Sequence, residues 1–233
     1  MLTAEEISAL VLSLQVAGLA LALSLPIAVA LAYILARKNF PGKIILDGLI
    51  HLPLVLPPVA TGFVLLMVLG RKGPVGGLLY ELLNITVAFR WTGAAIAASI
   101  MAFPLIVRPI RLAFEAIDPR LESAAATLGA HPAWVFLTIT LPLALPGVLS
   151  AMVLGFAKCL GEFGATITFV SNIPGETRTL PLALYTYTQV PGGEGPALRL
   201  AIIAVAISFA ALIIAEVLAA RTKRRIYRRG ELS

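Results

Sequence analysis

Two opposite charges stand within an otherwise uncharged, apolar stretch of the sequence. Lys158 and Glu162 are the only charged residues between positions 132 and 170. A charge costs about 2.5–3.5 kcal/mol at the centre of a bilayer on insertion scales, so it is rarely kept there without a role. Their i, i+4 spacing permits an ion pair along one helix face, but lysine before glutamate is the weaker order. We therefore expect at least one of them to reach another helix or subunit, as a structural ion pair or as a contact for an anion.

Neutral hydrogen-bond donors follow directly after this charged pair. Hydroxyl and amide groups can donate to an anion without adding a further cation, and too many cations would trap an anion that has to pass through. The sequence thus offers a second set of candidate residues for an anion pathway, namely Thr166, Thr168, Ser171 and Asn172.

Sets of residues that could form a nucleophile, a general base or a metal site are missing elsewhere. His51 and His131 are eighty residues apart and Cys159 is the one cysteine, so a zinc site would need many further partners. The glycine-rich stretch at 70–77 lacks the Gly-Lys-Ser/Thr ending of a phosphate-binding loop. The sequence predicts no catalytic residue, no metal site and no cofactor in this chain. If the protein's activity is driven by a nucleotide, another chain must bind that nucleotide.

The composition places the chain in a membrane. Of its 233 residues, 59% are hydrophobic and 13% are charged, whereas a soluble domain carries about 25% charged residues. A soluble domain and a disordered chain are both excluded. The net charge of +6 is concentrated in a basic tail with six Lys and Arg residues at 221–229. That position favours a cytoplasmic terminus over nucleic-acid binding.

Apolar runs predict an all-helical polytopic protein that forms one domain with about five transmembrane helices. About 20 apolar residues cross a bilayer. The acidic start at Glu5 and Glu6 is unlike a secretory signal, so we expect the first run to be retained. The predicted spans are about 7–36, 48–70, 91–107, 144–170 and 196–220.

The distribution of Lys and Arg predicts the orientation of these spans. Twelve lie in the connections and tail on one side, and five lie on the other. Because cytoplasmic loops carry the excess, we expect the N-terminus outside and the C-terminus in the cytoplasm.

Prolines and small residues indicate how two of the spans are built. Pro53, Pro57 and Pro58 should kink or unwind the second span, and His51 there is expected to be a satisfied interfacial residue. Prolines between 141 and 147 should separate the fourth span from the preceding loop. Small residues every four positions should let the fourth span pack closely on two sides, in the rows Gly147, Ala151, Gly155 and Ala157, Gly161, Ala165.

The predicted cytoplasmic loop at 108–142 contains a short helix with clear boundary signals. Asp118 can accept backbone N–H bonds as an N-cap, and Pro119 suits the first helical position. The helix should run through 120–128 and end at Gly129 in a left-handed cap. Spacing alone leaves open whether this is an ordinary helix on the membrane surface or a surface for a partner.

Residues 122–142 read ESAAATLGAHPAWVFLTITLP, which resembles the EAA loop of binding-protein-dependent ABC importers. In that family the loop's helix docks in a groove of the cytoplasmic ATPase and transmits its motion. Ser123 occupies the usual glutamate position, with Glu122 one place earlier. The resemblance assigns the coupling role to Glu122, Ser123, Ala124, Ala125, Gly129, Ile139, Leu141 and Pro142.

Two further stretches resemble the molybdate permease branch of these importers. They are FPGKIILDGLIHLPLVLPPVATGF at 40–63 and LGEFGATITFVSNIPGETRTLPLALYT at 160–186. The resemblance implies a type I ABC importer permease fold in a plasma membrane, or in the inner membrane of a two-membrane bacterium. It also implies a homodimer, two copies of an ATPase that binds ATP and Mg, and an extracytoplasmic molybdate-binding protein.

Other functions stay open at this point. Sulfate and tungstate permeases are close relatives with similar loops, and the sequence does not separate the three oxyanions. A self-contained secondary transporter or channel is a different class, and the absence of an inverted internal repeat weighs against it.

Overall fold

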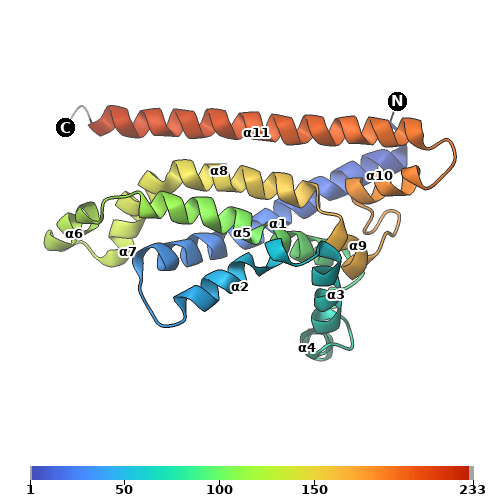
Figure 1. Cartoon of the computed structure of the whole chain (residues 1–233), viewed down its shortest axis with the longest axis horizontal. Helices are drawn as coiled ribbons and strands as arrows, with labels where there is room; N and C mark the ends of the chain where they lie inside the picture. Colours follow the sequence, from blue (N-terminus) through green and yellow to red (C-terminus); the bar gives the residue numbers. More distant parts are fainter. Residues whose placement is uncertain (1, 231–233) are drawn as a thin grey trace.

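The computed structural model describes residues 2–230, and all regular secondary structure within them is helical. Figure 1 shows the arrangement of the helices. In chain order they are α1 (Ala4–Arg37), α2 (Lys43–Val55), α3 (Pro58–Leu69), α4 (Pro74–Leu83), α5 (Trp91–Glu115), α6 (Pro119–Thr127), α7 (Pro132–Val135), the π-helical turn η1 (Phe136–Thr140), α8 (Leu141–Leu160), α9 (Gly164–Val170), α10 (Leu180–Thr188) and α11 (Glu194–Gly230).

Four continuous helical segments in the described residues are long and apolar enough to cross a membrane, and the bent pair α2–α3 would make a fifth. The all-helical prediction is confirmed. The third predicted span ended at 107 because Arg108 closes the uncharged run, yet α5 continues to Glu115. A helix can continue through charged residues near a membrane surface. The end of the uncharged run at 107 therefore predicted the end of this helix too early.

The second predicted span, 48–70, is not one continuous helix. It is divided into α2 and α3, whose axes differ by 115°. Leu56 has an extended backbone, and Pro57 precedes the first residue of α3. Consecutive prolines remove two backbone donors and disfavour helical geometry in the residue before them, so the helix ends and restarts in a new direction. The expected disruption of the helix by proline is thus confirmed, but the sequence did not predict a bend as large as 115°.

The fourth predicted span, 144–170, differs at both ends. The expected break at 141–147 is wrong, because α7, η1 and α8 form one apolar segment from Pro132 to Leu160. The π-helical turn η1 lies immediately before Leu141 and Pro142, where wider helical geometry accommodates a residue that lacks an N–H. At the other end α8 stops at Leu160, and α9 is a separate short helix.

Helix α5 forms the centre of the packing, between α1 and α8. Ala94, Ala95, Ala97 and Ala98 are fully buried there. The predicted row on α8 is confirmed, since a Cβ at Gly155 would lie 2.5 Å from Ile106 Cγ1 of α5. The second row is interrupted because Gly161 follows the end of α8, and Ala165 belongs to α9. Ala165 instead meets α3, where a Cβ at Gly62 would lie 2.5 Å from the Ala165 carbonyl oxygen.

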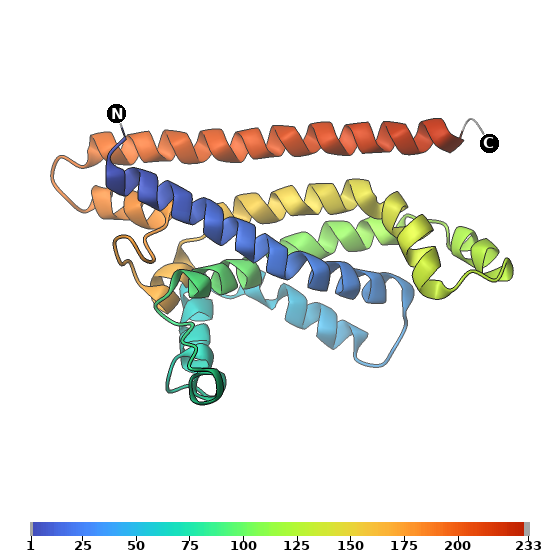
Figure 2. The same ribbon diagram turned by 180° about the vertical axis from the view of Figure 1, so that it is seen from behind.

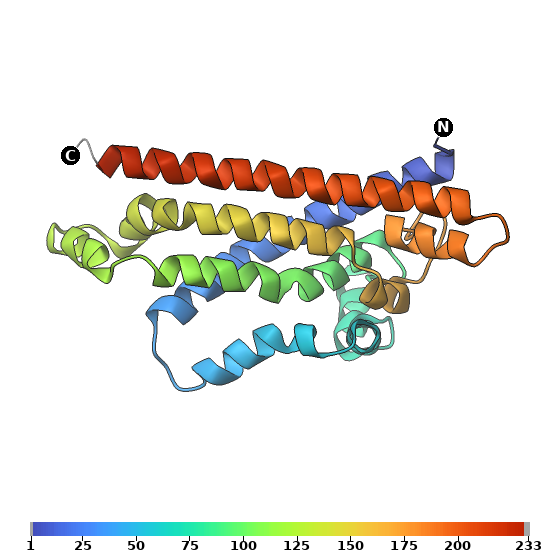
Figure 3. The same cartoon turned by 45° about the horizontal axis from the view of Figure 1, so that its top comes forward.

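The two ends of the molecule are different in character. Helices α6 and α7 lie at one end together with the C-terminal end of α11, and the start of α1 lies at the other end beside α10 (Figures 1 and 2). Helix α11 runs along the outside, next to α8 (Figure 3). Its exposed face is apolar, as expected where lipid replaces protein contacts. The side chains of the basic tail at 221–229 lie outside the described residues, so the count of twelve against five stays a prediction.

Candidate functional site

The helix in the predicted coupling loop forms as its sequence signals indicate. Asp118 Oδ1 accepts a hydrogen bond from the Arg120 backbone N–H at 2.9 Å, which caps the N-terminus of α6. At the other end Gly129 has a φ of +83°, and the Ala130 N–H donates to the Ala125 carbonyl at 3.1 Å. This six-to-one bond with a left-handed glycine is the Schellman arrangement. The predicted boundaries at Asp118 and Gly129 are confirmed, and α6 itself ends one residue earlier than expected.

Glu122 faces into the protein and holds α6 against the rest of the chain. Its Oε1 lies 3.1 Å from Arg37 Nη2 at the end of α1, and it accepts a hydrogen bond from Thr140 Oγ1 at 2.9 Å. Arg37 also donates to the Ile117 carbonyl at 3.1 Å. We call the three side chains Arg37, Glu122 and Thr140 the α6 clamp. It ties the short helix to both α1 and the π-helical turn.

The opposite side of α6 presents small and apolar groups to the surroundings. Ser123 and Ala124 are exposed while Ala125 is half-buried, and Leu128 is 89% exposed. Trp134 on α7 is also exposed, at 65%. Small side chains without bulk or charge allow another surface to approach the helix backbone closely. The remaining motif residues lie further along the same segment, with Ile139 and Leu141 half-buried and Pro142 exposed.

The charged pair at the end of α8 is bonded within the chain. Lys158 Nζ lies 2.6 Å from Glu162 Oε2, with side-chain exposures of 30% and 2%. Glu162 Oε1 also accepts the Ala165 N–H at 3.1 Å, so it reaches the start of α9. This second contact is local, three residues along the chain, and a contact of either side chain with a distant helix or a second subunit stays a prediction. The order rule for helix pairs does not apply here, because Glu162 lies beyond the last turn of α8.

The four predicted neutral donors have separate surroundings. Thr166 is buried on α9, and Thr168 donates to the Gly164 carbonyl of its own helix at 3.0 Å. Ser171 follows α9 with a φ of +66°. Asn172 joins this turn to its neighbours, because it donates to Thr186 Oγ1 at 2.8 Å and accepts from Arg178 Nε at 3.0 Å. Their role in a pathway stays a prediction.

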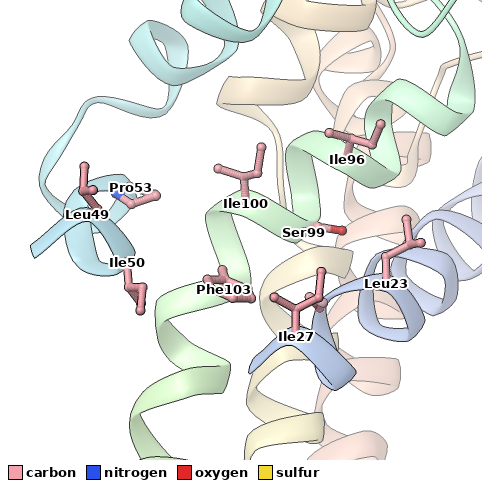
Figure 4. Close-up of a pocket in the computed structure, with 10 residues that line it drawn as sticks. Leu23, Ile27, Leu49, Ile50, Pro53, Ile96, Ser99, Ile100 and Phe103 are labelled. Carbon is pink, nitrogen blue, oxygen red and sulfur yellow. The ribbon is translucent and has the colours of Figure 1, made fainter. Parts of the chain in front are cut away.

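An apolar cleft of about 440 Å³ lies between α1, α2 and α5 (Figure 4). Isoleucine, leucine, proline and phenylalanine side chains line it, together with Ser24 and Ser99. Both hydroxyls donate to backbone carbonyls, Ser24 to Ala20 at 2.7 Å and Ser99 to Ala95 at 2.7 Å. The cleft therefore has no donor to spare for an oxyanion.

Sequence reasoning missed two features of the described chain. Arg37 and Thr140 are the partners of Glu122, but they are 85 and 18 residues away from it, and no local pattern connects them. The second feature is a polar cavity at the end of the molecule opposite α6. Its arginines, Arg71 and Arg90, belong to the five cations counted on one side of the membrane, and no sequence pattern brings them together.

Residues 24–224 match the family described as binding-protein-dependent transport system inner membrane component. The chain belongs to this family. Its members are inner membrane proteins that work with a binding protein, and this member is a multi-pass permease subunit of an ABC transporter, not itself the ATPase.

Relatives within the family match nearly the whole permease. The molybdenum transport system permease protein ModB of Escherichia coli K12 is 56% identical over 224 residues, which cover 96% of this chain and 98% of the relative. The ModB protein of Haemophilus influenzae is 53% identical, covering 95% and 96%. The sulfate transport system permease protein CysW of Synechococcus elongatus is 37% identical, covering 84% and 68%.

Solved transporters share the fold of this permease. A bacterial ABC transporter for the import of alginate matches with a TM-score of 0.73 and 17% identity, covering 94% of this chain and 80% of that one. The methionine ABC transporter MetNI matches with a TM-score of 0.66 and 14% identity, covering 93% and 94%. The predicted ABC importer permease fold is confirmed.

Proposed function

We propose that this chain is the permease subunit of an ATP-driven molybdate importer. The observation that carries the proposal is 56% identity along almost the full length to a molybdenum transport permease. The sulfate permease relative is less similar and shares less of its length. The substrate is accordingly a tetrahedral dianion that is passed inward by alternating access.

The proposed assembly contains two copies of this chain, two copies of a cytoplasmic ABC ATPase and an extracytoplasmic molybdate-binding protein. The name of the family supports the binding protein. The exposed small face of α6 supports a docked ATPase, since Ser123 and Ala124 leave room for a groove to close around the helix. ATP and Mg would be bound by that ATPase, and this chain would hold no cofactor.

The proposed orientation places α6 and the C-terminus in the cytoplasm and the N-terminus outside. Its support is the predicted excess of cations on the side of α6. The same assignment puts the helix that would meet the ATPase on the side where ATP is available.

The α6 clamp gives this assembly a physical route for coupling. An ATPase that moves α6 would pull on Arg37 and Thr140 through the Glu122 carboxylate. Arg37 ends α1, and Thr140 ends the turn that continues into α8. Both helices pack on the central α5, so a shift of α6 would be transmitted to the membrane-crossing core. Lys158, Glu162 and the donors Thr166, Thr168, Ser171 and Asn172 are proposed to lie along or beside the pathway.

The test is a comparison of substrates in proteoliposomes. The permease, its ATPase and its binding protein are reconstituted, and ATP-dependent uptake of radiolabelled molybdate is measured against competing tungstate and sulfate. We expect uptake of molybdate that sulfate in tenfold excess does not reduce. Equal or preferred uptake of sulfate would overturn the molybdate assignment while leaving the importer class intact.

A further inference from the structure

A polar cavity of about 1030 Å³ lies at the end of the molecule opposite α6. It is bounded by the N-terminal part of α1, the turn between α3 and α4 with Arg71, the segment from 84 to 92 that leads into α5, and the loop after α9. On the proposed orientation this cavity faces the extracytoplasmic side. Unlike the apolar cleft of Figure 4, it is rich in groups that can donate hydrogen bonds.

Two arginines line this cavity without a compensating partner. Within the described residues, neither Arg71 nor Arg90 forms an ion pair, and neither side chain donates a hydrogen bond. The Arg71 guanidinium lies over the Tyr80 ring, 4.0 Å from its centroid. Stacking uses the flat face of the guanidinium and leaves its N–H edge free, which is the edge that binds oxyanions in forked geometry.

Neutral donors surround the two cations. The lining includes Gln15 and Asn84, whose side chains carry amides, and Thr86 and Thr92, whose side chains carry hydroxyls. The segment that carries several of these residues has a left-handed backbone at Asn84, with a φ of +53°, and at Phe89, with a φ of +59°. At Asn84 this conformation caps the C-terminus of α4, where the Asn84 N–H donates to the Tyr80 carbonyl at 3.0 Å.

One acidic residue, Glu176, also lines the cavity. The charged lining is therefore two cations against one anion, and the remaining positive charge is modest. Such a balance attracts a dianion without holding it so tightly that it cannot move on.

We propose that this cavity is an outer receiving site for a tetrahedral oxyanion, in which Arg71 and Arg90 provide the charge and the amides and hydroxyls provide the orientation. This inference rests on the proposed function for its substrate. The dianion released by the binding protein is held here before the membrane-crossing helices admit it. A lipid phosphate has the same chemistry, so the experiment distinguishes the two sources.

The first measurement is binding without transport. The permease–ATPase complex is placed in nanodiscs of zwitterionic lipid, without ATP or binding protein, and radiolabelled molybdate binding is followed by equilibrium dialysis. We expect saturable binding that weakens by at least about tenfold in the double variant Arg71→Gln with Arg90→Gln. Glu176→Gln should tighten binding several-fold. Lys72→Gln removes a neighbouring cation that does not line the cavity and should leave binding unchanged.

Three results would overturn the receiving site. One is the absence of saturable binding in a complex that transports molybdate normally, and another is equal loss in Lys72→Gln and the arginine variants. The third is anionic lipid that copurifies with the wild type, is lost in the double variant, and occupies the cavity in place of molybdate. A complex that prefers sulfate in uptake would instead contradict the proposed molybdate function. In that case, sulfate binding that depends on the two arginines would still support the receiving site.

Discussion

Two carboxylates, Glu122 and Glu162, each join separate segments of the molecule at a candidate functional site. Glu122 connects α6 to Arg37 and Thr140, and Glu162 connects Lys158 to the start of α9. Their positions could be singled out from the sequence because a family motif contains one and an apolar run contains the other. The partners of Glu122 could not be predicted, because they come from segments far apart in the chain.

The α6 clamp predicts that Glu122→Gln separates ATP hydrolysis from transport. The amide keeps the shape of the side chain but loses the ion pair with Arg37, a hydrogen bond to a charged group worth about 1.5–3 kcal/mol. We expect ATPase activity in the assembled transporter to persist while molybdate uptake per ATP falls several-fold. Arg37→Gln should behave alike. Arg120→Gln, on the same helix and outside the clamp, is the control, and an equal loss in that variant would contradict the clamp's role.

The Lys158–Glu162 pair predicts rescue in a double variant. Lys158→Met leaves the buried Glu162 carboxylate without its cation, which is the costly state, and Lys158→Met with Glu162→Gln has no charge left to compensate. We expect the single change to lower the detergent melting temperature and the double change to restore it. Uptake should recover only in part if Lys158 also meets the passing dianion. Full uptake in Lys158→Met alone would exclude this lysine from the pathway.

At the scale of helices, the boundaries that could be predicted are those set by capping residues close to them in the sequence. Asp118, Pro119 and Gly129 fixed α6 because caps act through neighbouring backbone groups. Prolines indicated a disruption near the 115° bend between α2 and α3, but composition contains neither the angle of that bend nor the π-helical turn that keeps the segment continuous before α8. The predicted span 144–170 likewise joined α8 and α9, because the stretch is apolar apart from Lys158 and Glu162.

The cap at Gly129 gives a prediction for α6 as a unit. A Cβ at this position meets no atom within 4 Å, so Gly129→Val would be strained by its backbone alone, at about 1 kcal/mol or more. We expect the permease to insert and dimerise, while the ATPase dissociates on gel filtration or loses its coupling. Gly192→Val is the matched control, because Gly192 also has a positive φ and open surroundings at the other end of the molecule. Normal coupling in Gly129→Val would refute the account of this helix.

At the scale of the whole molecule, the coupling helix and the polar cavity lie at opposite ends of the helical core. That separation suits a protein that receives an ion on one side and is driven from the other. The fold class and the number of apolar runs could be predicted from the sequence, since both follow from composition and length. The cavity could not, because residues from four separate segments form it.

The orientation of the molecule is tested by reporters at its two ends. A fusion after Arg229 should be active only in the cytoplasm, and a fusion before Ile7 only outside. The reason is the excess of cations in the connections on the α6 side. If both reporters were active on the same side, the predicted five-span topology would be wrong, and the cytoplasmic position of α6 would lose its support.

Accumulation of radiolabelled molybdate against its gradient tests the central claim most directly. Proteoliposomes carry the binding protein inside the lumen, with the ATPase side of the permease and ATP outside, and export from the lumen to the outer solution is followed. We predict net movement beyond equilibrium only when ATP, the ATPase and the binding protein are all present, and a several-fold smaller movement with Glu122→Gln at matched ATP hydrolysis. Movement of molybdate that stops at equilibrium and needs neither ATP nor the binding protein would contradict the account and assign the chain to channels or secondary transporters.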